Sequence, residues 1–236
     1  GGAIRHVAPF LESGPDDPVL VFNGDILSGH DIAGQVKRWR DDEADVSLYL
    51  TRVEDPRAYG LVPTDERGRV TQFLEKPTTP EEIVTDQINA GCYVFRRSVI
   101  DSIPTGRPVS VERETFPGLL ARGAVVTGFV DDGYWLDLGT PLAFVQGSCD
   151  LVLGRAPSPA LPGRTGQFLV RPGAEVEPDA ILSNGTFVGA GATVGSGAVV
   201  DGSSLFDNAM VAAGGTTRPT GVRDRKSTRL KLQSRT

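Results

Sequence analysis

The chain of 236 residues is poor in the residues that build metal centres and disulfide frameworks, with two cysteines and two histidines. Cys92 and Cys149 stand far apart in apolar segments, so they form neither a metal-binding spacing nor a disulfide framework. Neither His6 nor His30 has a partner at metal-binding spacing. These absences argue against a structural zinc site and a disulfide scaffold, and they predict a reducing, cytoplasmic environment.

Long hydrophobic runs are also missing. No apolar run approaches the ~18 residues that a membrane-spanning helix needs, and no signal peptide is recognisable. The chain begins with Gly1-Gly2 instead of a methionine, in a segment with the pattern of a helix already under way. We therefore expect no membrane span, and we expect the sequence to start within a domain.

Positive charge is scarce over most of the chain, whose net charge is -6. Residues 218–236 hold seven basic residues and one acid, which leaves 17 basic and 29 acidic residues in the rest. So acidic a body gives no reason to expect nucleic-acid binding. The basic end has no repeat pattern, and we expect a disordered or non-native tail there.

The first part of the sequence alternates strand-like and helical patterns. Strand-like apolar runs lie at residues 19–23, 46–50, 88–95 and 125–129, and helical patterns lie at 32–40, 111–122 and 141–153. Such alternation is typical of an α/β domain in which helices cover the sheet. Continuous apolar runs are typical of strands that are buried on both faces. We therefore expect a Rossmann-like, mostly parallel sheet over residues 1–154.

A different pattern follows a proline-rich linker at 155–167, because aliphatic residues recur at every sixth position. These anchors are Val170, Val176, Leu182, Val188, Val194, Val200, Phe206 and Ala212. A residue that is mostly small stands four positions after each anchor. In a β-helix built from hexapeptides, the anchors stack inward and the small residues fit the corners. We predict a left-handed parallel β-helix over residues 168–217.

Carboxylates stand at the ends of two strand-like runs, at Asp25 and Asp137. Open α/β sheets place their chemistry at the carboxyl ends of strands. Between the two aspartates, Glu75 and Lys76 stand side by side. Two acids with a lysine between them suit a hard metal ion that handles phosphate groups. Taken alone, Asn23-Gly24 also fits a turn and Glu75-Lys76 a solvent-exposed pair, so the interpretation depends on the whole set.

The ordered set of motifs resembles the sugar-phosphate nucleotidyltransferases. The motifs are Asn23-Gly24-Asp25, Tyr59-Gly60, Glu75-Lys76-Pro77, Ile88-Asn89-Ala90-Gly91, Ser110-Val111-Glu112-Arg113-Glu114 and Trp135-Leu136-Asp137-Leu138-Gly139-Thr140-Pro141. The hexapeptide repeats narrow the resemblance to the two-domain members. The segment around Glu112, followed by Thr115-Phe116-Pro117, is most similar to the mannose-1-phosphate guanylyltransferases.

The resemblance implies a reaction and a role for each matching residue. These enzymes join a nucleoside triphosphate, here GTP, to a sugar 1-phosphate, here mannose 1-phosphate, and release pyrophosphate. Asp25 and Asp137 match the two aspartates that bind Mg²⁺, and Lys76 matches the lysine that holds the sugar phosphate. The implied sugar-binding residues are Gly60, Glu75, Asn89, Gly91 and Glu112, and the implied nucleotide-binding residues are Gly1, Gly2, Asn23 and Gly24. The β-helix commonly mediates association in relatives, so a homo-oligomer is possible.

The sequence also departs from the family. The family opens with a strand and a glycine-rich loop that wraps the triphosphate, and neither precedes Gly1-Gly2. Such a loop supplies backbone N–H groups to phosphates. We therefore expect the sheet to be incomplete at its N-terminus, and we expect this chain to bind nucleoside triphosphate poorly and to turn over little.

Three alternatives differ in class. One is a binding or regulatory protein of the same fold, which need not keep Asp25, Lys76 and Asp137. A second is a glucose-1-phosphate thymidylyl-, uridylyl- or adenylyltransferase, because no residue here decides the base. A third is a hexapeptide acyltransferase, which is improbable because such enzymes use a histidine base and no histidine follows His30.

Overall fold

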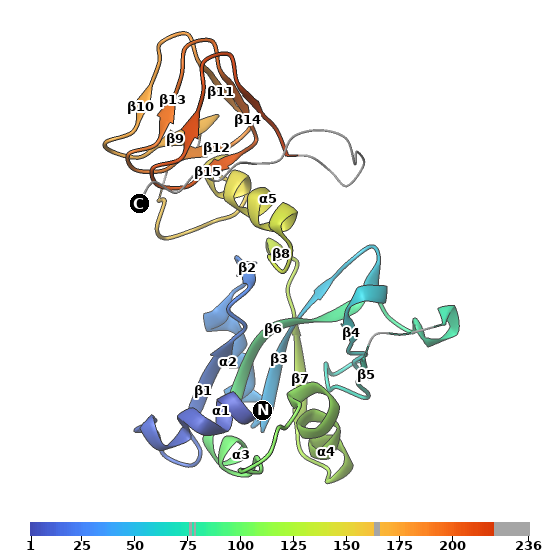
Figure 1. The fold of residues 1–236 in the computed structure, drawn as a ribbon. Helices are drawn as coiled ribbons and strands as arrows, with labels where there is room; N and C mark the ends of the chain where they lie inside the picture. The colour runs from blue at the N-terminus through green and yellow to red at the C-terminus, as the bar shows by residue number, and fades with distance from the viewer. Residues whose placement is uncertain (76, 78, 163–165, 220–236) are drawn as a thin grey trace. The chain divides into compact units, whose positions relative to one another are not determined.

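The computed structural model describes residues 1–75, 77, 79–162 and 166–219 (Figure 1). Its contacts divide into two compact units, Gly1–Trp135 and Leu136 onward. The sequence places a domain boundary near residue 154, after the helix at 141–153, and this helix belongs to the second compact unit.

The first unit is an α/β domain. Its strands are β1 (Pro18–Phe22), β2 (Ile26–Ser28), β3 (Val46–Arg52), β4 (Gly60–Leu61), β5 (Leu74–Glu75), β6 (Gln87–Arg96) and β7 (Val126–Val130). Its helices are α1 (Gly2–Val7), α2 (Ile32–Asp41), α3 (Arg97–Asp101) and α4 (Phe116–Ala121), with short helical turns η1 (Ala8–Phe10), η2 (Pro56–Ala58), η3 (Pro80–Glu82) and η4 (Val111–Thr115). The α/β class expected from the sequence is confirmed.

Strand β6 is the centre of the sheet. Strand β3 pairs along one of its edges, while β1 and β4 pair with the two halves of the other edge. All three neighbours run antiparallel to β6, and only β3 and β7 pair in parallel. The expectation of a mostly parallel sheet is therefore wrong for the strands that the structure describes. An apolar run shows that both faces of a strand are buried, but it carries no information on strand direction.

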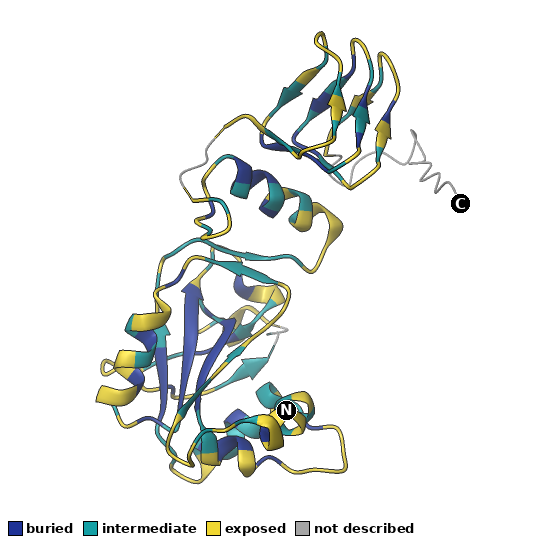
Figure 2. Cartoon of the chain, turned by 90° about the vertical axis from the view of Figure 1, so that its left-hand side faces the viewer, coloured by how far each residue is buried: buried dark blue, intermediate teal, exposed yellow. Residues whose placement is uncertain are grey.

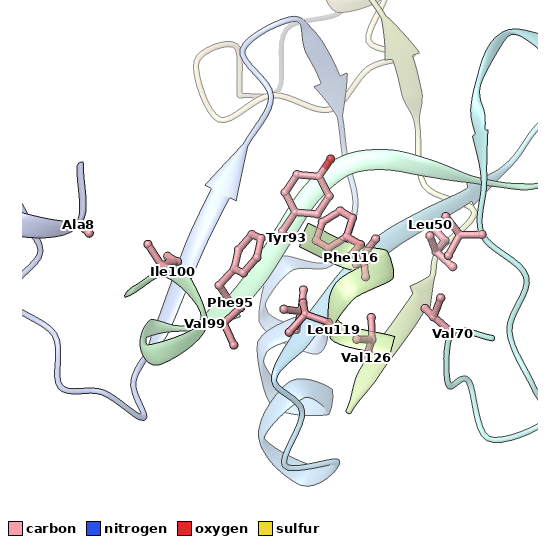
Figure 3. Close-up of a cluster of buried hydrophobic side chains, with 13 residues drawn as sticks. Ala8, Leu50, Val70, Tyr93, Phe95, Val99, Ile100, Phe116, Leu119 and Val126 are labelled. Carbon is pink, nitrogen blue, oxygen red and sulfur yellow. The ribbon is translucent and has the colours of Figure 1, made fainter. Parts of the chain in front are cut away.

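Helices cover both faces of this sheet, and the buried central strands lie between them (Figure 2). Side chains alternate between the faces along β6, as the period of a strand requires. Tyr93 and Phe95 pack with Phe116, at the start of α4, in the larger core (Figure 3). Val94 faces the other way and packs with Trp39 of α2. Burying a side chain of this size contributes about 1.5 to 3 kcal/mol.

In its described part, the second unit holds α5 (Pro141–Val152) and nine short strands. These are β9 (Phe168–Val170), β10 (Glu175–Val176), β11 (Ile181–Ser183), β12 (Thr186–Val188), β13 (Thr193–Val194), β14 (Val199–Asp201), β15 (Ser204–Leu205), β16 (Met210–Val211) and β17 (Thr216–Thr217). They form three parallel sheets of three strands each. This arrangement confirms the predicted β-helix. The linking strand β8 (Trp135–Asp137) spans the boundary of the two units.

The hexapeptide register slips once, which the sequence pattern did not predict. From the first coil to the second, paired residues are 18 apart, as in Leu169 with Phe187. From the second coil to the third they are 17 apart, as in Val188 with Leu205. The inward anchors of the third coil are therefore Leu205 and Val211, whereas the predicted Phe206 and Ala212 are exposed. At both positions two apolar residues are adjacent in the sequence, Leu205-Phe206 and Val211-Ala212. A strict six-residue period predicts the second residue of each pair as the inward anchor, whereas the first one faces inward.

Candidate active site

Gly60 and Glu75 face each other across the antiparallel pair β4 and β5. A Cβ on Gly60 would lie 2.8 Å from Oε2 of Glu75, so the carboxylate lies directly over the glycine. Glycine is thus required at this position by the close approach of another side chain. The Glu75 carboxylate occupies the space that the side chain of any larger residue at position 60 would need.

Four of the five predicted sugar-binding residues line one small hollow on the first unit. They are Gly60, Glu75, Asn89 and Glu112, which come from β4, β5, β6 and η4. Leu61, Val62, Phe73 and Leu74 complete the wall. Two carboxylates and an amide on apolar walls can accept and donate the hydrogen bonds that sugar hydroxyls need. The sequence separations show that the fold, not the local chain, brings these groups together.

The amide of Asn89 is held on several sides. Its Nδ2 donates to the Tyr93 hydroxyl at 2.9 Å and to Oε1 of Glu112 at 3.4 Å. Its Oδ1 accepts from the backbone N–H of Gly91 at 3.2 Å. These contacts fix which end of the amide is the donor and which is the acceptor. Asn89 therefore presents a defined orientation to the hollow.

Sequence reasoning missed Tyr93. Its side chain is 3% exposed, and burial raises the pKa of its phenol, against smaller opposite effects of hydrogen bonds with Asn89 and Asn23. The phenol is therefore neutral at physiological pH and can both donate and accept. A spacing of four along a strand places Asn89 and Tyr93 on one face, and this signal was available in the sequence.

Gly91 interrupts the regular pairing of β6. The register passes from Leu48 opposite Tyr93 to Leu50 opposite Asn89, so β6 bulges here. Gly91 has φ +81°, and a Cβ on it would lie 2.9 Å from Nδ2 of Asn23. The backbone N–H of Asn23 donates to the Gly91 carbonyl at 2.8 Å. The bulge thus brings the Asn23-Gly24-Asp25 turn beside the strand that carries Asn89.

Asp25 is exposed in the turn between β1 and β2. In the second unit, Asp137 ends β8, and its Oδ1 accepts from the backbone N–H of Gly139 at 2.7 Å. Thr140 then caps α5 by accepting from Ala143 N–H. Within the described ranges, no group of three or more His, Cys, Asp or Glu side chains is placed to hold a metal ion.

The predicted nucleotide-binding glycines differ in their surroundings. A Cβ on Gly1 would lie 2.9 Å from the Val109 carbonyl, whereas one on Gly2 or Gly24 would meet no atom within 4 Å. Lys76, the predicted phosphate-binding residue, lies outside the described residues.

Comparison with known proteins decides the family. Residues 1–152 match the family model described as Nucleotidyl transferase. The chain belongs to this family. It is 56% identical over 215 residues to the mannose-1-phosphate guanylyltransferase of Mycobacterium tuberculosis, and the aligned region covers 91% of this chain and 58% of that protein. It is 33% identical over 180 residues to the mannose-1-phosphate guanylyltransferase catalytic subunit beta of Drosophila pseudoobscura pseudoobscura, covering 74% of this chain and 47% of that protein.

A solved structure of this nucleotidyltransferase fold is also similar. HddC from Yersinia pseudotuberculosis, in a complex with GMP-PN, matches with a TM-score of 0.51 and 25% identity over 62% of this chain and 59% of that chain. Our chain thus spans about half the length of the relatives that it matches. Among the helices that the structure describes, none is long and apolar enough to cross a bilayer.

Proposed function

We propose that this nucleotidyltransferase transfers GMP from GTP to mannose 1-phosphate. An oxygen of the sugar phosphate bonds to the α-phosphorus of GTP, the bond to the β-phosphate bridge breaks, and GDP-mannose and pyrophosphate result. The observation that carries the proposal is the 56% identity to a mannose-1-phosphate guanylyltransferase over 91% of this chain. The carboxylates and the amide that line the hollow around Glu75 support the proposal of a sugar site there.

The residues of the hollow would bind and orient the sugar. Glu75 accepts hydrogen bonds from sugar hydroxyls, and Gly60 leaves room for its carboxylate. Asn89 offers an amide that is already oriented, and Glu112 adds a second acceptor. Lys76, next to Glu75 in the sequence, binds the phosphate as a compact charge. Holding the attacking phosphate in line with GTP accounts for most of the catalysis expected of these residues.

Asn23, Gly24, Gly1 and Gly2 would contact the nucleotide. Gly2 and Gly24 have open space where a Cβ would lie, so a ligand can approach their backbone closely. Gly91 shapes the bulge against which Asn23 rests. Their roles follow from the motifs, and the open space supports them.

The donor set suits Mg²⁺. The Asp25 carboxylate is exposed and, among the described residues, takes part in no ion pair or side-chain hydrogen bond. Oδ1 of Asp137 accepts from the Gly139 N–H, and Oδ2 has no hydrogen-bond partner among the residues that the structure describes, so it is available to a ligand. Mg²⁺ is usually held by one or two carboxylates together with substrate oxygens. When bound, the ion neutralises phosphate charge and orients the triphosphate.

Both cysteines are free and buried, as in a reducing compartment. We propose a cytoplasmic location on this ground.

Ligand binding is the first test of the proposed function. Mannose 1-phosphate and glucose 1-phosphate are titrated into the chain in the presence of Mg²⁺, with and without GTP, and heat or NMR shifts are recorded. We expect mannose 1-phosphate to bind more tightly, and Glu75→Gln to weaken it about tenfold or more through loss of a charged acceptor. Glu81→Gln is the matched control, because Glu81 is exposed on η3 and outside the hollow.

Pyrophosphate release from GTP and mannose 1-phosphate is the second readout. A preference for glucose 1-phosphate with another nucleoside triphosphate would replace the proposed substrates. Tight binding with no turnover, in a version as long as the relatives, would indicate a sensor of nucleotide sugars.

A further inference from the structure

Asp131, directly after β7, bridges two segments of the first unit. Its Oδ2 accepts from the backbone N–H of Asp31 at 2.8 Å, and its Oδ1 accepts from the backbone N–H of Gly133 at 2.7 Å. One residue therefore joins the start of α2 to the segment that leads into Trp135. Neither the motifs nor the proposed chemistry assigns Asp131 a role.

Two further contacts fasten the same segments. The backbone N–H of Gly29 donates to the Tyr134 carbonyl at 2.8 Å. A Cβ on Gly133 would lie 3.2 Å from the Gly29 carbonyl oxygen, so the two backbones lie against each other. The indole N–H of Trp135 donates to the Ala90 carbonyl at 3.0 Å, which ties this segment to β6. We name the segment of residues 131–135 the strap.

His30 lies between Gly29 and Asp31, the two residues whose backbone N–H groups are bonded to the strap, and its side chain is anchored in the core. His30 is stacked on Tyr49 with ring centroids 3.9 Å apart, and its Nε2 lies 3.2 Å from Oε1 of Gln35. Nε2 of Gln35 donates to the Ser47 carbonyl, so Oε1 is the acceptor and His30 carries its proton on Nε2. Residues 29–31 are thus held by the strap on one side and by β3 on the other.

These contacts fix the turn that carries Asp25 at both of its ends. On the upstream side, Asn23 N–H is bonded to the Gly91 carbonyl. On the downstream side, only the three residues of β2 separate Asp25 from the strapped residue Gly29. A short segment pinned at both ends leaves its exposed carboxylate little freedom.

A carboxylate at position 131 is suited to this task. Two N–H donors converge on its two oxygens, and an amide could satisfy only one of them. Negative charge is also favourable at the start of α2, where Asp31 already caps Gly34 N–H.

We propose that Asp131 is a positioning residue, which holds the turn of Asp25 in the geometry that binds the divalent ion. The proposal rests on the proposed function, because that function assigns the metal to Asp25. It adds a residue that touches neither metal nor substrate and acts through the backbone of residues 29–31.

The test compares Asp131→Asn with Asp132→Asn. The second variant makes the same change in charge one residue further on, where the side chain is exposed. Amide hydrogen exchange is measured at Gly29, Asp31 and Gly133, and Mn²⁺ is titrated while broadening of the Asp25 amide signal is followed. We expect Asp131→Asn to speed exchange about tenfold at one of the two amides of Asp31 and Gly133, the one that loses its acceptor. We expect it to weaken Mn²⁺ binding at Asp25 about tenfold as well, and Asp132→Asn to change neither.

Each other result counts against the proposal in a distinct way. Unchanged exchange in Asp131→Asn would show that its carboxylate does not hold the strap. Faster exchange with unaltered Mn²⁺ affinity would show that the strap does not position Asp25. If Mn²⁺ leaves the Asp25 signal of the unmodified chain unaffected, the metal assignment of the proposed function fails, and the positioning role falls with it even where the exchange result holds.

Discussion

Gly60 is a glycine because the carboxylate of Glu75 takes the space of a side chain. A methyl group there would push the carboxylate out of the hollow or force β4 away from β5. The free energy of unfolding should change little in the first case, since the carboxylate is only partly buried. The affinity for the sugar should change much more.

We expect Gly60→Ala to weaken mannose 1-phosphate binding about 10- to 100-fold, the value of a charged hydrogen bond. Titration calorimetry measures the affinity. Gly118→Ala is the control, because a Cβ at Gly118 in α4 meets only the end of Arg122 at 3.8 Å. Equal affinities for the two variants would contradict the proposal that the Glu75 carboxylate above Gly60 binds the sugar.

Tyr93 provides a second test at the same scale. We expect Tyr93→Phe to weaken sugar-phosphate binding about fivefold, because Asn89 loses the acceptor at 2.9 Å that orients its amide. Tyr49→Phe removes a hydroxyl from another fully buried tyrosine, which lies in a separate cluster. A loss of affinity in both variants would point to a general effect on the core.

The sequence indicated which residues form the hollow, and the structure explains how they meet. Motif order singled out Gly60, Glu75, Asn89 and Glu112 without any knowledge of their contacts. The bulge at Gly91 was not predictable, because a glycine within an apolar run also fits a regular strand. Asp131 was missed because an aspartate after a strand is common in turns, and only its two backbone partners distinguish it.

At the scale of elements, the slipped coil gives the clearest test of the structure. A strict hexad places Phe206 inside the β-helix, whereas the structure leaves it 64% exposed. Val200 is fully buried in the same stack. The two alternatives differ in the expected cost of truncating Phe206.

We expect Val200→Ala to lower the free energy of unfolding by about 2 kcal/mol. Phe206→Ala should lower it by no more than about 1 kcal/mol, through its contact with Phe144 of α5. Denaturant unfolding followed by circular dichroism measures both. A cost of about 3 kcal/mol or more for Phe206→Ala, as in a buried site, would restore the uniform period.

The directions of the strands in the sheet could not be predicted from the sequence. The antiparallel pair β4 and β5 is connected through a turn at residues 65–68, and turn residues of this kind specify a hairpin locally. The direction of β6 depends on the path of the whole chain between distant strands. Hydrophobic runs do not reveal this path, so they do not predict the direction of β6.

At the scale of the whole molecule, His30 couples stability to pH. Its burial lowers its pKa below the usual 6.5, and this outweighs the opposite effects of Gln35, Asp131 and Asp31. The unfolded chain therefore binds more protons than the folded chain between 6.5 and the lower folded value. The burial of His30 therefore costs no stability above pH 6.5, and the free energy of unfolding declines as the pH falls through this window.

We expect the free energy of unfolding to fall as the pH is lowered below about 6.5, and His30→Gln to remove most of this slope. Urea unfolding at several pH values measures it. His6→Gln is the control, because His6 is the other histidine of the chain and is exposed. The same slope in both variants would show that other groups are responsible.

The 17-residue step between the second and third coils has a consequence for how the β-helix finds its alignment. In a stack of identical coils, a chain displaced by one whole coil would still match every anchor to an anchor. Here the steps differ, because paired residues are 18 apart between the first two coils and 17 apart between the second and the third. A chain displaced by one coil would therefore turn Phe206 into the interior in place of Leu205. One missing residue thus makes the coils distinguishable and disfavours both slippage and the exchange of coils between neighbouring molecules.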